Sequence, residues 1–88
     1  MKLLMFAVRD RATDMFGTPM FLVSTGQAIR SFADEVNRAA ADNQLANHAE
    51  DFDLYALGEF DTNTAEFTTA RPEQIAIGKN VKLNGSGK

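Results

Sequence analysis

The stretch that decides the fold is STGQAIRSFADEVNRAAA, residues 24–41. Its apolar side chains recur at offsets of three, four, seven and eleven residues from the first, and they are Ile29, Phe32, Ala33, Val36 and Ala40. This spacing places all five on one face of an α-helix. Ser24 is suited to be the N-cap, with Gln27 as its capping-box partner. The sequence therefore predicts an amphipathic helix whose apolar face a sheet can bury.

Two strands are predicted before this helix. Residues 2–9 contain an unbroken apolar run between charged residues, which is typical of a strand buried on both faces. Residues 10–18 are expected to form a loop, and residues 20–23 a second strand that enters the helix directly. Because no helix separates the two strands, we expect them to pair antiparallel.

A hairpin is predicted after the helix, beyond a polar connection at residues 42–51 with room for one short helical turn around Leu45. Residues 52–61, FDLYALGEFD, alternate as a half-buried strand does. Strict alternation assigns the core side to Leu54, Ala56, Gly58 and Phe60, and the other side to Asp53, Tyr55, Leu57, Glu59 and Asp61. Residues 65–69 form the partner strand after a turn. Arg71 and Pro72 are expected to break the ladder before a further short edge strand at residues 74–77.

The order ββαββ, with a possible fifth strand, predicts an α+β fold: an antiparallel sheet of four to five strands with one α-helix packed on one face. Residues 1–83 are expected to form a single domain and residues 84–88 a flexible C-terminal tail. One helix protects one face only, so Tyr55 and Leu57 on the other face are candidates for a homodimer interface. In the competing interpretation, residues 10–18 or 70–83 fold over that face within one chain.

Composition excludes several functions. The 88 residues include no cysteine, which rules out disulfides, Cys-based zinc sites and thiol catalysis. The start, MKLLMFAVRD, mimics a signal peptide, but its apolar run is short and meets charged residues without a small-residue cleavage site, so we interpret it as a strand. No stretch has transmembrane length, and no membrane association is expected.

Charge is unevenly distributed along the chain. Residues 42–75 contain eight carboxylates and one arginine, whereas residues 1–41 are close to neutral and residues 76–88 carry three lysines, for a total of −3. Proteins that bind phosphates non-specifically usually have a basic surplus. The net negative charge therefore counts against avid nucleic-acid binding, but it is compatible with a local basic patch.

No catalytic or metal site is predicted. His48 is the single histidine, and Glu50 and Asp51 beside it suggest metal binding or proton transfer. Neighbours in a loop rarely converge, however, so a solvated acidic loop is the preferred interpretation. The glycines form no phosphate-binding loop, and the serines have no plausible base. We therefore expect neither enzyme activity nor a cofactor.

A basic strip is the best candidate for a binding site. Five residues are candidates for contacting DNA: Arg9, Arg11, Phe16, Lys79 and Lys82. If the C-terminal segment returns beside the first strand, they combine cations with an aromatic ring, as grooves for single strands do. Ordinary surface charge is the alternative. Arg30 and Arg38 are reserve candidates, since each is also placed to pair with Asp34 four residues away.

Several segments resemble a known family. GQAIRSFADEVN (residues 26–37) and HAEDFDLYALGEFD (residues 48–61), followed by a turn and AEF, resemble the small nonstructural protein of gokushoviruses, which are single-stranded DNA microviruses of bacteria. The family is often described as the phage open-reading-frame-five protein. RDRATDMFGTPMFLVS (residues 9–24) resembles its loop-then-strand entry. Ala49 stands where the family pattern usually has proline.

The resemblance implies a non-virion accessory protein in the cytoplasm of the host bacterium. Such a protein is expected to bind single-stranded DNA weakly during genome synthesis or the change from replication to packaging. The resemblance brings no catalytic motif with it. The alternative is an adaptor or regulator whose acidic surface binds a basic partner, such as a phage replication or procapsid protein, without contacting DNA.

Overall fold

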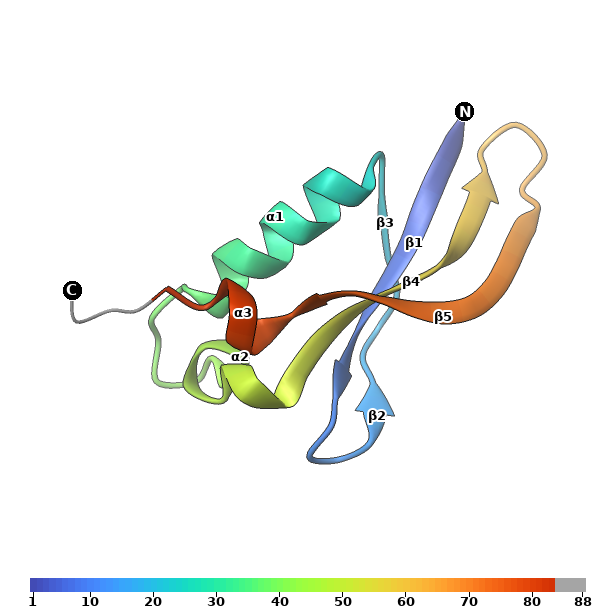
Figure 1. The fold of residues 1–88 in the computed structure, drawn as a ribbon. Coiled ribbons are helices and arrows are strands. Elements are labelled where there is room, and N and C mark those ends of the chain that lie inside the picture. Colours follow the sequence, from blue (N-terminus) through green and yellow to red (C-terminus); the bar gives the residue numbers. More distant parts are fainter. Residues whose placement is uncertain (84–88) are drawn as a thin grey trace.

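The computed structural model describes residues 1–83, and the predicted tail, residues 84–88, lies outside the described part. The elements follow in the order β1 (Lys2–Asp10), β2 (Met15–Phe16), β3 (Met20–Leu22), α1 (Thr25–Val36), α2 (Gln44–Asn47), the 3-10 helix η1 (Ala49–Asp51), β4 (Phe52–Asp61), β5 (Phe67–Ile77) and α3 (Gly78–Val81). α1 packs against one face of an antiparallel sheet, with the short helices near its C-terminal end, so the predicted α+β fold is confirmed (Figure 1). None of the helices in residues 1–83 is both long and apolar enough to span a membrane.

The sheet is built around β1. Its strand order is β2-β1-β4-β5, and β3 also pairs with β1. β4 therefore lies along one edge of β1, while β2 and β3 pair with the two ends of the other edge. The predicted antiparallel pairing of the two strands before the helix is confirmed for β1 and β3. The two-residue β2 lies in the segment that was predicted to be a loop.

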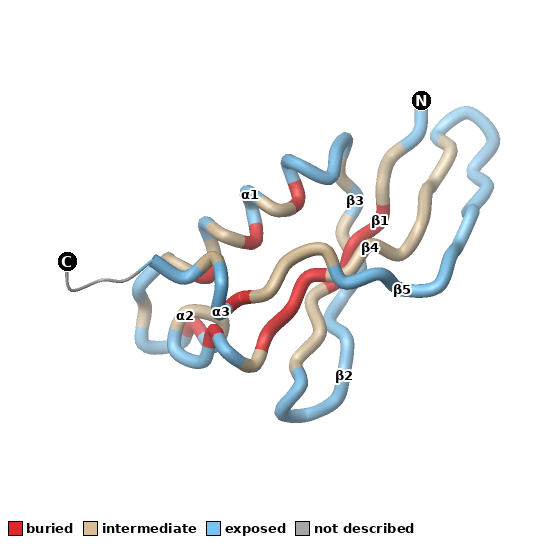
Figure 2. The backbone as a smooth tube through the Cα atoms, in the orientation of Figure 1, coloured by how far each residue is buried: buried red, intermediate tan, exposed pale blue. Residues whose placement is uncertain are grey.

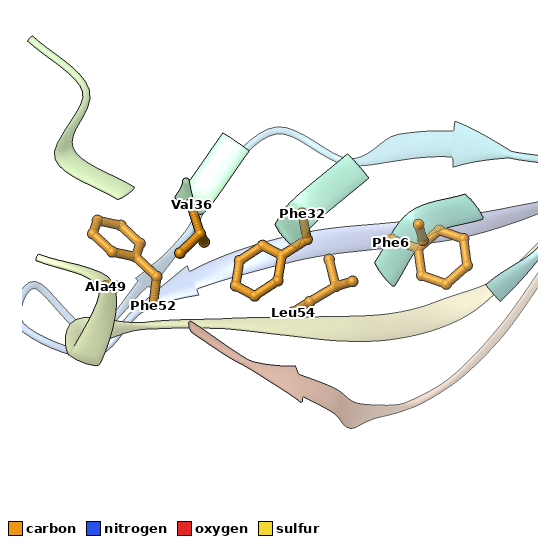
Figure 3. Close-up of a cluster of buried hydrophobic side chains, with 7 residues drawn as sticks. Phe6, Phe32, Val36, Ala49, Phe52 and Leu54 are labelled. Carbon is orange, nitrogen blue, oxygen red and sulfur yellow. The ribbon is translucent and has the colours of Figure 1, made fainter. Parts of the chain in front are cut away.

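The core lies between α1 and the sheet. Phe32 and Val36 of α1 are 3% and 0% exposed, and they pack in one cluster with Phe6 of β1 and Leu54 of β4. Figure 3 shows Phe32 pointing from α1 towards Leu54. Buried residues are concentrated in the middle of β1, the start of β4 and the inner side of α1, whereas β2 and most of β5 are exposed (Figure 2).

α1 begins as predicted. The Oγ of Ser24 accepts a hydrogen bond from the backbone N–H of Gln27 at 3.1 Å, which satisfies one of the free donors of the first turn. The side chain of Gln27 reaches back and accepts from the N–H of Val23 at 3.1 Å, one residue before the N-cap. The cap therefore fixes both the helix start and the exit from β3.

The predicted helix end at residue 41 is wrong, because α1 ends at Val36. The side chains of two asparagines donate hydrogen bonds to carbonyl groups in the last turns of α1. The Nδ2 of Asn37 donates to the carbonyl of Ala33 at 2.8 Å, and the Nδ2 of Asn43 donates to that of Glu35 at 2.9 Å. Asparagine competes in this way with a continuing helix.

A β-bulge at Leu57 reverses the faces of β4. Met5 of β1 pairs with Gly58, and the next residue of β1 pairs with Ala56, so Leu57 is the extra residue. Residues that pair directly across antiparallel strands share a face. Phe60, which pairs with Leu3, therefore lies on the face opposite α1, and the predicted grouping of Phe60 with Leu54 is wrong.

Two further consequences of this bulge bear on the sheet. Glu59 and Asp61 lie on the α1 side, not on the opposite face as alternation predicted. Gly58 has φ of 146°, and a Cβ at this position would overlap the carbonyl oxygen of Thr68. Only glycine fits both the conformation and the space.

The predicted break at Arg71 and Pro72 is also wrong, because β5 runs on from Phe67 to Ile77. The pairing changes register instead: Gly58 pairs with Thr69, and Ala56 pairs with Glu73, which leaves residues 70–72 opposite a single residue of β4. Pro72 has no N–H for the ladder, and an edge strand with an irregularity accommodates it.

Candidate nucleic-acid interface

The sheet face opposite α1, which we call the open face, is aromatic along most of its length. The register places on it Leu3, Met5, Ala7, Arg9, Phe16, Phe21, Asp53, Tyr55, Phe60, Phe67, Gln74 and Ile77. Leu57 and Gly58 of the bulge belong to it as well. Asp53 is the one carboxylate in this set, while Glu59, Asp61 and Glu73 fall on the α1 side. The open face is therefore depleted of negative charge, although residues 42–75 are strongly acidic.

One end of the open face carries the basic cluster, which consists of Arg9, Arg11 and Lys79. These three side chains line a hollow of about 460 Å³ together with Asp53, Tyr55 and three neutral residues. Arg9 pairs with Asp53 of β4, which pairs in turn with the last residue of β5, so α3 follows at the same end. The C-terminal segment therefore lies beside β4 and not beside β1, as the prediction required. Lys79 nevertheless comes close to Arg9 and Arg11.

Arg9 is held in place by its neighbours. It forms an ion pair with Asp14 of the turn between β1 and β2. The hydrogen bond with Asp14, and then that with Tyr55, raises the pKa of Arg9 above its ordinary value. Its guanidinium carbon lies 6.0 Å from the centre of the Phe16 ring, within cation–π range.

Arg11 is anchored to the sheet by a buried carboxylate. Its Nε lies 2.9 Å from Oδ2 of Asp53, which is 3% exposed, and its guanidinium also donates to the carbonyl of Glu50. The other oxygen of Asp53, Oδ1, is buried with no hydrogen-bond partner in the described part of the chain. Lys79 is exposed and forms no ion pair with any residue in 1–83. It is therefore the cation most available to an incoming anion.

Phe16 and Tyr55 form an aromatic pair beside the basic cluster. Their ring centres lie 5.2 Å apart in an edge-to-face arrangement, and Phe16 remains 45% exposed. Ala7, which pairs with Tyr55, is 1% exposed, since so small a side chain lets the two rings meet above it. Tyr55 thus packs against Phe16 of residues 10–18, and Leu57 is half-buried in the bulge. The homodimer through Tyr55 and Leu57 stays a prediction.

The other end of the open face carries three phenylalanines that sequence reasoning did not single out. We call Phe21, Phe60 and Phe67 the Phe cluster. Their ring centres are 4.9 to 6.3 Å apart, and Phe21 and Phe67 are 43% and 60% exposed. With Leu3 they line a hollow of about 340 Å³. The signal that could have revealed the cluster is Gly58, because a glycine inside a strand often marks a bulge.

The remaining candidate cations lie elsewhere. The Nζ of Lys82 donates to the carbonyls of Val36 and Ala46 at 3.1 Å each, so it closes the C-terminal end of α1. Arg38 makes two hydrogen bonds with Glu35, at 2.9 and 2.7 Å, and not with Asp34. This pair lowers the pKa of Glu35 and raises the pKa of Arg38. Both cations lie on the helix side and outside the basic cluster.

His48, Glu50 and Asp51 come closer together than loop neighbours were expected to. Their possible ligand atoms lie within 4.8 Å of one another at η1. His48 and Glu50 are exposed, and acidic groups gather in this way on many protein surfaces. The trio is close enough to hold a metal ion, and its exposure alone does not point to one.

The fold and the site define a small α+β protein with one helix-covered sheet face and one aromatic face that is basic at one end. The chain matches the family described as "Phage ORF5 protein" over residues 3–81, and it belongs to that family. The match confirms the resemblance drawn from residues 9–67, and it spans nearly every element from β1 to α3. No curated protein and no solved structure matches the chain.

Proposed function

We propose that this phage accessory protein binds single-stranded DNA weakly through its open face. The observation that carries the proposal is the meeting of Arg9, Arg11 and Lys79 beside Phe16 and Tyr55. Cations that track phosphates and rings on which bases stack are the combination found in single-strand binding grooves. As expected of a nonstructural protein, it would act on genomes in the host cytoplasm, during synthesis or the change to packaging.

The acidic segment opposes this function only in part, because the sheet separates three of its four strand carboxylates from the site, and the fourth, Asp53, is paired with Arg11. Glu59, Asp61 and Glu73 lie on the α1 side of the sheet. A layer of sheet and side chains is about 10 Å thick, which is close to the Debye length of ~8–10 Å in physiological salt. The repulsion between these charges and a DNA strand on the open face is therefore reduced.

The ion pairs of the basic cluster account for weak binding. Arg9 is already paired with Asp14, and Arg11 with Asp53, so a phosphate must compete with carboxylates for two of the three cations. Lys79 has no such competitor within the described residues. We therefore expect affinity in the micromolar range or weaker, with a large part of the charge contribution from Lys79.

Fluorescence anisotropy with a labelled oligonucleotide at low salt tests the proposal. Lys79→Ala should weaken binding several-fold, because it removes the free cation of the site. Arg30→Ala is the matched control: it removes one charge from an exposed position of α1, on the far side of the sheet. It should leave binding unchanged. Absence of wild-type binding at high micromolar protein, or equal losses in both variants, would overturn the proposal.

A protein-binding role is the second candidate, since the register gathers Glu59, Asp61 and Glu73 on the α1 side. Such a surface suits a basic protein partner. Pull-down from infected cells after nuclease treatment separates the two functions. Recovery of phage replication or procapsid proteins without DNA favours the adaptor, and their loss after nuclease treatment favours DNA binding.

A further inference from the structure

We infer that the Phe cluster is a second subsite for the same DNA strand, a platform on which nucleobases stack. This inference rests on the proposed function and adds a second place where bases are bound, at the end of the open face away from Phe16 and Tyr55. Phe21, Phe60 and Phe67 come from three different strands, and the bulge at Leu57 brings Phe60 to this face. The two outer rings, Phe21 and Phe67, leave 43% and 60% of their surface in contact with solvent.

The chemistry of the hollow fits a nucleobase. Its lining consists of Leu3 and the three phenylalanine rings, which provide no hydrogen-bonding side chain. A ring that enters it can gain from stacking and from apolar contact, but not from base-specific hydrogen bonds. Its volume of about 340 Å³ lies at the lower end of the range for small-ligand sites. Such a platform accepts any base, because every base has a flat π-face.

The distance between the two subsites suits a short strand. Leu3 lies at the Phe cluster and Arg9 at the basic cluster, six residues apart on β1. At ~3.3 Å per residue this separation is about 20 Å. A single strand with bases stacked at ~3.4 Å covers it with about six nucleotides. Met5 and Ala7 lie between the two ends and carry no charge, so they do not repel a backbone that passes over them.

Charge favours DNA over a basic protein as the occupant. Three acidic side chains are next in sequence to the Phe cluster: Glu59 and Asp61 point to the α1 side, and Glu66 is exposed just before Phe67. From the Phe cluster to Arg9, Arg11 and Lys79 the register places one carboxylate on the open face, Asp53, and Asp14 of the turn after β1 reaches the basic end through its ion pair with Arg9. A partner that covers the whole face must therefore tolerate aromatic contact at one end and cations at the other. A single strand of DNA does both.

The test compares two oligonucleotides that share a sugar-phosphate backbone: a twelve-residue thymidine oligomer and an abasic oligomer of the same length. The wild-type protein should bind the thymidine oligomer about tenfold more tightly, as one stacked base contributes. Phe67→Leu keeps an apolar side chain and removes the ring, so it should reduce this preference to what Phe16 and Tyr55 contribute, while leaving abasic binding unchanged. Phe67→Tyr keeps the ring and should retain the preference. Circular dichroism verifies the fold of each variant.

Oligomer length gives an independent readout. Wild-type affinity should rise between four and eight thymidines, when the strand first reaches both subsites, and Phe67→Leu should show no such rise. An unchanged preference in Phe67→Leu overturns this inference and leaves the proposed function intact. Equal wild-type affinity for thymidine and abasic oligomers overturns this inference and also base stacking on Phe16 and Tyr55, and leaves only phosphate binding by the basic cluster. No binding to either oligomer overturns both. A loss of affinity in Phe67→Leu together with a change in mass by light scattering makes the Phe cluster an interface between copies, which also overturns the inference.

Discussion

Gly58 is the residue on which the shape of the sheet depends. Its φ of 146° and the carbonyl oxygen of Thr68 leave no place for a Cβ. Gly58→Ala should therefore lower the free energy of unfolding by at least ~1–3 kcal/mol, the usual cost of a strained backbone conformation. Urea denaturation followed by circular dichroism measures this change.

Gly26→Ala is the control for that substitution. Gly26 lies in the first turn of α1, and the nearest heavy atom to a new Cβ is 4.0 Å away. Alanine should stabilise the protein here by ~0.4–1 kcal/mol, because it restricts the unfolded chain and suits the helix. If both glycines tolerate alanine equally, the bulge is not as rigid as the geometry of Gly58 requires.

Phe32 is the anchor of the helix in the core. It is 3% exposed, so Phe32→Ala leaves a cavity and should cost ~3–5 kcal/mol. This loss is comparable with the whole stability of many small domains. The variant should be largely unfolded at room temperature by circular dichroism.

Phe67→Ala makes the same chemical change at a position that is 60% exposed and should leave thermal stability nearly unchanged. Melting of Phe32→Ala within a few degrees of wild type would show that the packing of α1 on the sheet has been misjudged.

Among the elements, α1 shows how a short polar contact sets a boundary. Ser24→Ala removes the acceptor for the N–H of Gln27 and should cost ~1 kcal/mol, which lowers Tm by ~4–8 °C in a domain of this size. Ser31→Ala, at an exposed position inside the helix, is the matched control and should not lower Tm. Equal shifts in the two variants would mean that the cap contributes nothing.

The start of α1 could be predicted from sequence because its determinants are local, whereas its end could not. Asn37 donates to the carbonyl of Val81 as well as to that of Ala33, and no pattern within four residues reveals a contact across 44 positions. β4 illustrates the same limit. Strict alternation assigned its faces correctly as far as Ala56 and wrongly for Phe60, because one extra residue reverses everything after it.

The candidate site also has a part that could be predicted from sequence and a part that could not. Arg9, Arg11 and Phe16 are close in sequence, and Lys79 joins the two arginines although β5 returns beside β4 and not beside β1, as the prediction required. Lys82 lies only three residues further on, but α3 turns it towards the C-terminal end of α1. The Phe cluster was missed since its existence depends on the bulge.

For the molecule as a whole, the small number of cations on the open face predicts a modest dependence on salt. Three phosphate contacts in a single-strand complex give a slope of about −2 in log affinity against log salt. Affinity should therefore fall ~20-fold between 50 and 200 mM salt, as anisotropy titrations can measure. A slope close to zero would indicate that stacking alone holds the strand and that the basic cluster is not used.

Self-association concerns the whole molecule as well. We predict a homodimer through Tyr55 and Leu57, and these residues lie on the face proposed for DNA. A second copy and a DNA strand would then compete for one surface. Light scattering at tens of micromolar should show a mass above that of the 9.6 kDa chain, and saturating oligonucleotide should reduce it to one chain per strand.

Two outcomes contradict this prediction. A mass of one chain at every concentration means that no homodimer forms. A dimer that persists with DNA bound means that the copies meet elsewhere. Leu57→Glu serves as the matching variant, and it should dissociate the dimer without loss of the helical signal.

The extra residue at Leu57 shifts by one the alternation that assigns each position of β4 to a face of the sheet. Before it, even positions of β4 contribute to the core, and after it they lie on the opposite side. A single-residue deletion here would therefore invert the roles of every later position in the strand without changing its composition. Relatives that lack this residue should compensate by exchanging the odd and even positions that follow, so that rings and carboxylates remain on their own sides. If substitutions alone are counted, such relatives differ at several positions. These differences have a single origin, which is one inserted residue and the exchanges that restore each side chain to its face.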